Sequence, residues 1–318
     1  QLRPIPFHKE IELPGGGQVK LRRAGHILGA ANAELHWGGK TIVFSGDIGR
    51  YGDPFMLDPE PVAAADYVLV ESTYGDRTHP KNDPMEALGD VIEKTVRRGG
   101  TVIIPAFAVG RAQLIMYYLW KLKQAGRIKI VPIFLDSPMA INATDLLCRH
   151  LDDHRLSPDV CKQSCDIATY LREVDDSKRI TRDTMPKVVI AASGMLTGGR
   201  VLHHLKAFGQ DSRNTILFSG YQAGGTRGEK LLNGAESVKM FGQWFPIRAE
   251  IASLPALSAH ADSDEILKWL SGFKHAPART FVVHGEPKAS DALRMRIGEE
   301  LGWNSTVVDS TDRYFLEG

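Results

Sequence analysis

Hydrophobic and polar positions alternate along the first 75 residues in the two-residue rhythm of β-strands. The alternating runs are Val19–Leu21, Ala33–Trp37 and Thr41–Phe44, and Tyr67–Val70 is a continuous apolar run. The Gly38-Gly39 pair separates two of these runs, as expected for a β-hairpin. The pattern therefore predicts a β-rich segment that ends near residue 75.

From about Pro84 the period lengthens to that of α-helices, which alternate with short apolar strands. Helices are expected at 85–96, 111–124 (strongly amphipathic), 139–150 and 200–208, and strands at 101–104, 128–134, 188–190 and 215–218. This alternation predicts a mostly parallel sheet covered by helices. The stretch Ser157–Pro186 is rich in Asp, Lys and Arg and is predicted to be an irregular segment that contains one helix.

The chain returns to strand, loop and helix from about Ile247. Strands are expected at 248–253 and 280–283, and helices at 262–270 and 287–301. Asp262 and Glu265 have the spacing of a capping box, so His260 is expected in the loop just before a helix.

Length and charge limit the classes of protein to which the chain can belong. A chain of 318 residues can hold two domains. Its net charge of +1 gives no long-range attraction to nucleic acid, so a groove that binds nucleic acid would have to concentrate Lys and Arg. Neither a signal peptide nor an apolar stretch approaching the roughly 20 residues of a membrane helix is present. We therefore expect a cytoplasmic protein that does not bind membranes.

Three cysteines lie close together in the sequence at positions 148, 161 and 165, without a C-x-x-C pair. Their odd number in a chain of this length favours a reducing compartment. We interpret Cys148, Cys161 and Cys165 as structural thiols in preference to a redox or metal site.

Five polar residues stand near the ends of apolar runs or between small neighbours: His26, Asp47, Glu71, His260 and His284. Strand ends fix such side chains in position, while Gly, Ser and Ala leave room for a substrate. A lone histidine is more often a hydrogen-bonded structural residue, and a Gly-Asp pair is common in turns. Together, the five residues point to a metal site with acid–base groups.

The segments around these five residues resemble the metallo-β-lactamase superfamily, and more specifically its β-CASP branch of nucleases. They are Ala24–Ala30, Phe44–Arg50, Val70–Arg77, Leu257–Asp262 and Val282–Pro287. The resemblance implies an α/β fold, in which a metallo-β-lactamase αββα sandwich, N-terminally incomplete, carries an inserted Rossmann-like β-CASP domain. The expected domains are 1–75 and 251–318 for the sandwich and 76–250 for the insertion.

The resemblance also implies roles. His26, Asp47 and His284 correspond to metal ligands for two Zn²⁺, with Asp47 bridging both ions. His260 and Glu71 correspond to catalytic residues, with His260 giving a proton to the leaving oxygen and Glu71 orienting it. The implied activity is zinc-dependent hydrolysis of RNA phosphodiester bonds, with endonuclease or 5′–3′ exonuclease mode and a homo-oligomeric state left open. A non-catalytic scaffold in an RNA-processing complex and a DNA-processing nuclease are the alternatives.

Four loops that follow strands in the 76–250 region are rich in glycine and hydroxyl residues, a composition that suits phosphate binding at helix N-termini. The glycines could equally serve tight turns. With the family resemblance, we expect a groove for the RNA backbone formed by Arg111, Ser193, Gly194, Gly198, Gly199, Arg200, Gly225, Thr226 and Arg227.

Two further features complete the expectations. The family's His-x-His-x-Asp-His segment is absent and the chain starts at Gln1 without methionine, so we expect a missing N-terminal portion and an inactive fragment that cannot fill two zinc sites. His150 and His154 are spaced as in zinc-binding helices but lack the Glu after the first His, so we interpret them as a solvated helix end. His79 and the other histidines receive no functional role.

Overall fold

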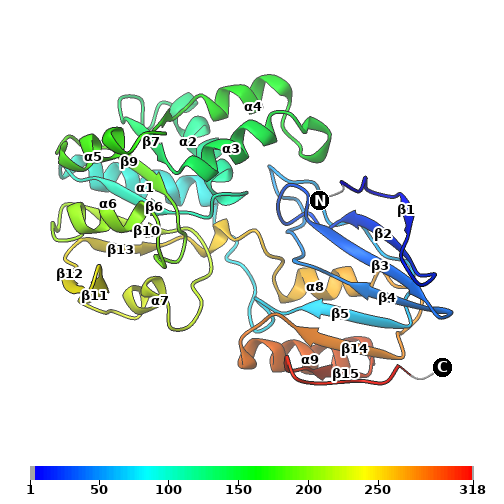
Figure 1. Ribbon diagram of the computed structural model, residues 1–318. Helices are drawn as coiled ribbons and strands as arrows, with labels where there is room; N and C mark the ends of the chain where they lie inside the picture. Colours follow the sequence, from blue (N-terminus) through cyan, green and yellow to red (C-terminus); the bar gives the residue numbers. More distant parts are fainter. Residues whose placement is uncertain (1–3, 317–318) are drawn as a thin grey trace. The chain divides into compact units, whose positions relative to one another are not determined.

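The computed structural model describes residues 4–316, and these residues form two compact units (Figure 1). Unit 1 contains the residues up to His79, the stretch from Ala259 onward and the short segment Asp153–Arg155. Unit 2 contains Pro80–Asp152 and Leu156–Ser258. The sequence placed the boundaries at 75/76 and 250/251, whereas the structure has them at 79/80 and 258/259.

Unit 1 contains a seven-stranded sheet in the order β1-β2-β3-β4-β5-β14-β15. The strands are β1 (Glu10–Glu12), β2 (Gln18–Arg23), β3 (Ala31–Trp37), β4 (Lys40–Phe44), β5 (Tyr67–Glu71), β14 (Arg279–Val283) and β15 (Ser305–Val307). The pairings from β1 to β4 are antiparallel, and those from β4 to β15 are parallel. The predicted Gly38-Gly39 hairpin is confirmed by the pairing of Trp37 with Lys40.

Helices α8 (Ser263–Leu270) and α9 (Pro287–Leu301) pack on this sheet. Their side chains, among them Trp269 and Leu293, share a fully buried core with Val68 and Val282 of the strands. The predicted capping box at the start of α8 is confirmed. Because β4, β5 and β14 are adjacent and parallel, their carboxyl ends meet at one edge of the sheet. Asp47, Glu71 and His284, three of the predicted site residues, lie at this edge.

Unit 2 contains the predicted parallel sheet, six-stranded and in the order β13-β10-β6-β9-β7-β8. Its strands are β6 (Val102–Pro105), β7 (Ile133–Asp136), β8 (Thr169–Tyr170), β9 (Val188–Ala191), β10 (Thr215–Phe218) and β13 (Glu250–Ser253). The pairing of β13 with β10 explains why unit 2 extends past residue 250.

The helices of unit 2 are α1 (Pro84–Arg97), α2 (Arg111–Gln124), α3 (Pro138–Leu147), α4 (Pro158–Cys165), α5 (Val174–Arg182), α6 (Val201–Phe208) and α7 (Arg227–Leu232). A hairpin of β11 (Ser237–Met240) and β12 (Gln243–Pro246) and two short 3₁₀ turns, Leu151–Asp153 and Pro255–Leu257, complete the elements. None of the helices in the described part of the chain has the length and apolar character needed to cross a membrane. The α/β fold is confirmed.

Three local predictions were wrong. The strand expected at 128–134 begins only at Ile133, because Pro132 has no amide hydrogen for a sheet, and Ile130 is exposed. Helix α2 is buried on nearly all sides and is not amphipathic. The stretch Ser157–Pro186 forms two helices, α4 and α5. Ser157 caps α4, and α5 has acidic residues in its first turn and basic ones in its last, as the helix dipole favours.

Candidate active site and metal centre

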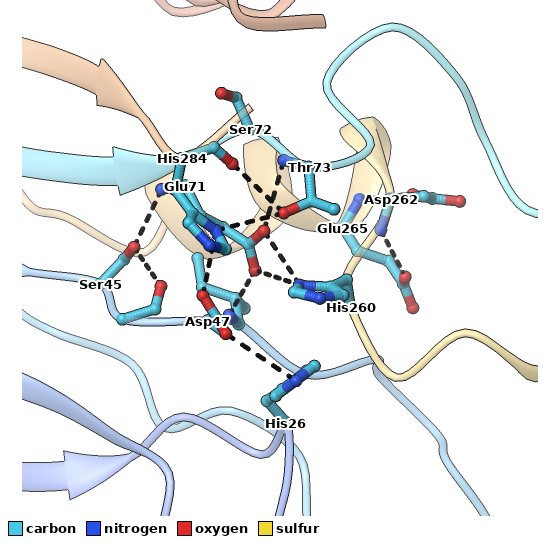
Figure 2. A network of polar contacts seen from close by, with 12 residues as sticks. His26, Ser45, Asp47, Glu71, Ser72, Thr73, His260, Asp262, Glu265 and His284 are labelled. Atoms are coloured by element: carbon cyan, nitrogen blue, oxygen red, sulfur yellow. Dashed lines mark hydrogen bonds and ion pairs between the residues drawn. The ribbon is translucent and has the colours of Figure 1, made fainter. Parts of the chain in front are cut away.

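The structure brings the five predicted site residues together in unit 1 (Figure 2). Glu71 is the last residue of β5, His284 directly follows β14, and Asp47 lies in the turn after β4. These three converge because their strands are neighbours and parallel. His26 and His260 come from loops, which β-bridges attach to the turn that carries Asp47.

Two glycines allow the His26 loop and the Asp47 turn to approach each other closely. A β-carbon at Gly49 would overlap the backbone of Gly25, and Gly25 itself has a positive φ of 75°. Gly49 donates its amide to Ala24 and forms a bridge with His260. Any side chain at position 49 would therefore separate His26 from Asp47.

The Asp47 carboxylate lies between two histidines, with one oxygen directed at each (Figure 2). Oδ2 is 3.9 Å from Nε2 of His26, and Oδ1 is 3.2 Å from Nδ1 of His284. His284 has a left-handed backbone (φ 53°), which is uncommon for a residue other than glycine and concentrates at functional sites. The Thr73 hydroxyl lies 3.4 Å from the same His284 nitrogen. A carboxylate in this position offers one oxygen on the side of each histidine.

His26 is prepared to act as a neutral ligand. Burial, and then the charge of His260, lower the pKa of His26 from 6.5 to about 4, so its imidazole is uncharged at neutral pH. Its buried Nδ1 atom has no hydrogen-bond partner among residues 4–316. Neutral imidazole is the form that binds zinc. The donor atoms of His26, Asp47 and His260 lie within 4.8 Å of one another, as do those of Asp47, Glu71 and His284. These donor sets fit metal binding.

Glu71 and His260 form a buried pair beside Asp47. The two carboxylate oxygens of Glu71 are 3.2 and 3.1 Å from Nδ1 of His260, and Glu71 is 1% exposed. Burial alone would raise the pKa of Glu71, but hydrogen bonds from His260, Thr73 and the Ile48 amide hold it below its ordinary value. The carboxylate is therefore ionised and fixes the ring of His260. The ring of His260 packs against that of His26 in a tilted arrangement, at a centroid distance of 4.2 Å.

His79, to which the sequence gave no role, also supports this site. Its Nε2 lies 2.9 Å from the carbonyl oxygen of His260, and its amide donates to the Asp262 carboxylate at 2.8 Å. His79 therefore holds the loop that carries His260. The Asp262 cap of α8 was visible in the sequence, but nothing there indicated that His79 would contact it.

The interpretation of His150 and His154 as a solvated helix end was wrong for His154. His154 is 5% exposed, belongs to unit 1 and stacks on Phe55 at a centroid distance of 6.1 Å. His150 is exposed in unit 2. The two histidines therefore do not share a helix face, and His154 packs as a core residue.

The loops expected to bind phosphate lie in unit 2, and two of them are joined. The side-chain amide of Gln222 donates to the Gly194 carbonyl at 3.0 Å, and Gly228 N donates to Met195 at 3.3 Å. Arg227 reaches back from α7 to the carbonyl of Leu196 at 2.9 Å. The loop 192–200 and the loop 219–228 therefore form one continuous surface.

Some of the residues predicted to bind phosphate make structural contacts within these loops, and at others the backbone is not crowded by neighbouring atoms. Ser193 accepts hydrogen bonds from the amides of Thr197 and Gly198 at 3.0 and 3.3 Å. Thr226 caps α7 through the amide of Glu229. Gly194 packs against Phe107, and Gly199 has a positive φ of 80° beside Ala192, whereas a β-carbon at Gly198 or Gly225 would meet nothing within 4 Å. Arg111 is buried next to Gly220. Their role in phosphate binding stays a prediction.

Arg200 has an internal role that the sequence did not reveal. Its Nη1 donates to the fully buried carboxylate of Asp136 at 2.7 Å and to the Leu171 carbonyl at 2.9 Å, and its Nη2 donates to Arg172 at 2.8 Å. Burial would raise the pKa of Asp136, but hydrogen bonds from His204, Ser177 and Arg200 lower it. The pair links the end of β7 to the start of α6.

Replacing Arg200 by alanine should therefore destabilise the protein. Removing one partner of a buried ion pair costs about 3 kcal/mol or more, because the remaining charge stays buried. Arg179→Ala, which breaks an exposed pair with Asp176, is the control and should cost at most about 1 kcal/mol. Urea unfolding of both variants measures the difference. Equal effects would mean that the Asp136 pair does not stabilise unit 2.

Comparison with known proteins agrees with this geometry. Two domain models match the chain: the Beta-Casp domain over residues 112–231, and the Zn-dependent metallo-hydrolase RNA specificity domain over residues 244–308. Ribonuclease TTHA0252 of Thermus thermophilus is 37% identical, with 92% of this chain and 68% of the relative covered. An RNase J-like protein of Methanocaldococcus jannaschii is 30% identical, with 93% and 70% covered. Transcription termination factor FttA of Methanosarcina mazei is 31% identical, and the chain spans only 50% of its length.

Proposed function

Because the chain belongs to the β-CASP family of metallo-β-lactamase-fold hydrolases, we propose that the protein is a zinc-dependent ribonuclease that hydrolyses RNA phosphodiester bonds. The observation that carries the proposal is the Asp47 carboxylate, which directs one oxygen at His26 and the other at His284. Two zinc ions would be held by these residues, His26 and Asp47 on one and Asp47 and His284 on the other. Zinc at such a site supplies an activated water molecule and positive charge opposite the phosphate.

The residues around the metal set would provide acid catalysis. His260 is held by Glu71 through Nδ1, which leaves Nε2 as the atom that can give a proton to the leaving oxygen. The ionised Glu71 keeps the ring in one orientation. His79 fixes the backbone of the same loop. The chain thus offers separate groups for metal binding and for proton transfer.

RNA as the substrate is supported by the matched RNA specificity domain and by the ribonuclease among the relatives. The joined loops of unit 2 would contribute contacts to the phosphate backbone, with the uncrowded backbone at Gly198 and Gly225 as the candidate positions. Arg227 lies beside them. Contacts of this kind position the strand without selecting a base sequence.

The complete protein, loaded with zinc, should cut single-stranded RNA much faster than DNA of the same sequence, because the 2′-hydroxyl is available only in RNA. A chelator should abolish the cleavage and added zinc should restore it. Both rates are measured with end-labelled oligonucleotides. Faster cleavage of DNA would favour the DNA-processing alternative. No cleavage of either strand by protein with bound zinc would favour the scaffold alternative.

A further inference from the structure

Three thiols that take no part in the contacts described so far converge at one point in unit 2. Cys148 caps the C-terminal end of α3, and Cys161 and Cys165 lie one turn apart on α4. The Cys148 sulfur is 2.9 Å from that of Cys161 and 3.4 Å from that of Cys165. All three sulfurs lie within 4.8 Å of one another, and they are the only cysteines of the chain. Cys148 and Cys161 are 13 residues apart in the sequence, and the fold brings their sulfurs together with that of Cys165 in a single cluster.

The number and placement of the sulfurs suit a metal ion. Thiolates around one zinc ion lie about 3.8 Å apart, given the ~2.3 Å Zn–S bonds of a tetrahedral site. The cluster needs only a small outward shift to reach that spacing. A disulfide would use two of the sulfurs and leave the third without a purpose, whereas a metal ion uses all three. In the part of the chain that the structure describes, no further His, Cys, Asp or Glu joins the group.

The surroundings favour a cation over free thiolates. Cys148 stands at the C-terminal end of α3 and Cys165 is the last residue of α4, and helix C-termini attract positive charge and repel negative charge. Reactive cysteines have the opposite environment, at a helix N-terminus or beside a cation.

We propose that Cys148, Cys161 and Cys165 bind one soft metal ion, Zn²⁺ or Cu⁺, as a three-thiolate site separate from the catalytic centre. Binding replaces the three thiol protons by three metal–sulfur bonds and releases those protons to solvent, with no change of oxidation state. Cu⁺ accepts three thiolates, and Zn²⁺ would add a water molecule as its fourth ligand. Cys148 is only partly buried, so the ion and the water can enter from solvent. The bound ion would tie the end of α3 to α4.

The test uses the full chain, reduced and stripped of metal, and titrated with Cd²⁺ as a spectroscopic probe for Zn²⁺ and separately with Cu⁺. Thiolate-to-metal charge transfer in the near ultraviolet should saturate at one ion per chain. The His and Asp ligands near β5 give no such band, so His284→Ala should keep it. Cys148→Ser, Cys161→Ser and Cys165→Ser should each weaken or remove it. Failure of the proposed ribonuclease activity would not affect this readout.

A second measurement needs no variant and therefore does not depend on folding of the serine proteins. The reaction of the three thiols with a maleimide should slow at least tenfold when the metal is present. Unchanged thiol reactivity and an absent charge-transfer band would overturn the proposal. A disulfide between Cys148 and Cys161 in protein prepared without added oxidant would also overturn it, because two of the three ligands would then be consumed.

Discussion

Replacing Asp47 by alanine in the complete protein should remove both bound zinc and RNA hydrolysis. The side chain directs one oxygen at each of two histidines, so its loss opens both metal sites together. The loss of activity should exceed the ~100-fold typical of changes to residues that only support metal ligands. Zinc content by atomic emission and cleavage rate, measured on the same sample, test this expectation.

The matched control is Asp291→Ala, which removes an exposed carboxylate on α9 in the same unit. It should leave zinc content and activity unchanged. His284→Ala should resemble Asp47→Ala in losing zinc, though only one of the two sites is opened. Full zinc content in the Asp47→Ala protein would show that the ligands are assigned wrongly.

Replacing His260 by alanine should have a different signature, with zinc retained and kcat lowered by about 10²–10⁴, the usual contribution of general acid catalysis. Glu71 anchors the ring of His260. In this assignment the ring lies beside the proposed metal ligands but does not itself bind zinc. A substrate with a better leaving group needs less protonation, so it should partly rescue His260→Ala but not Asp47→Ala. His275→Ala, an exposed histidine of unit 1, is the control.

Two results would contradict this assignment. Loss of zinc in His260→Ala would make His260 a ligand together with His26 and Asp47, whose donor atoms lie within reach. Absence of rescue by the activated substrate would remove its role as the acid. Glu71→Gln should also lower kcat, because a neutral amide holds the ring of His260 more weakly than the carboxylate does.

The convergence of Asp47, Glu71 and His284 could be predicted from the sequence for a simple physical reason. Each follows an apolar strand, and parallel neighbouring strands bring their carboxyl ends to one edge. The contacts that tune the site could not be predicted in this way. The bond from His79 to His260 joins residues 181 positions apart, and local patterns contain no information on such pairs.

The same limit explains the errors in unit 2. Arg200 stands in a glycine-rich loop and therefore suggested a phosphate contact, but its partner Asp136 is 64 residues away. The three cysteines lack the spacing of known metal motifs, and only the packing of α3 beside α4 brings them together. By contrast, the helices α4 and α5 had local signals in Ser157 and in the charge order of α5, so they could have been predicted.

The pairing of β5 with β14 has a consequence for the order of events during synthesis. The two strands are joined through contacts such as Ser72 to Val283, which are 211 residues apart. All of unit 2 lies between these two strands in the sequence, interrupted only by the short segment Asp153–Arg155, which belongs to unit 1. On a ribosome, the whole of unit 2 is therefore synthesised before β14 and His284 emerge. Pairing over such a separation is slow, so we expect the proposed metal centre to form after unit 2.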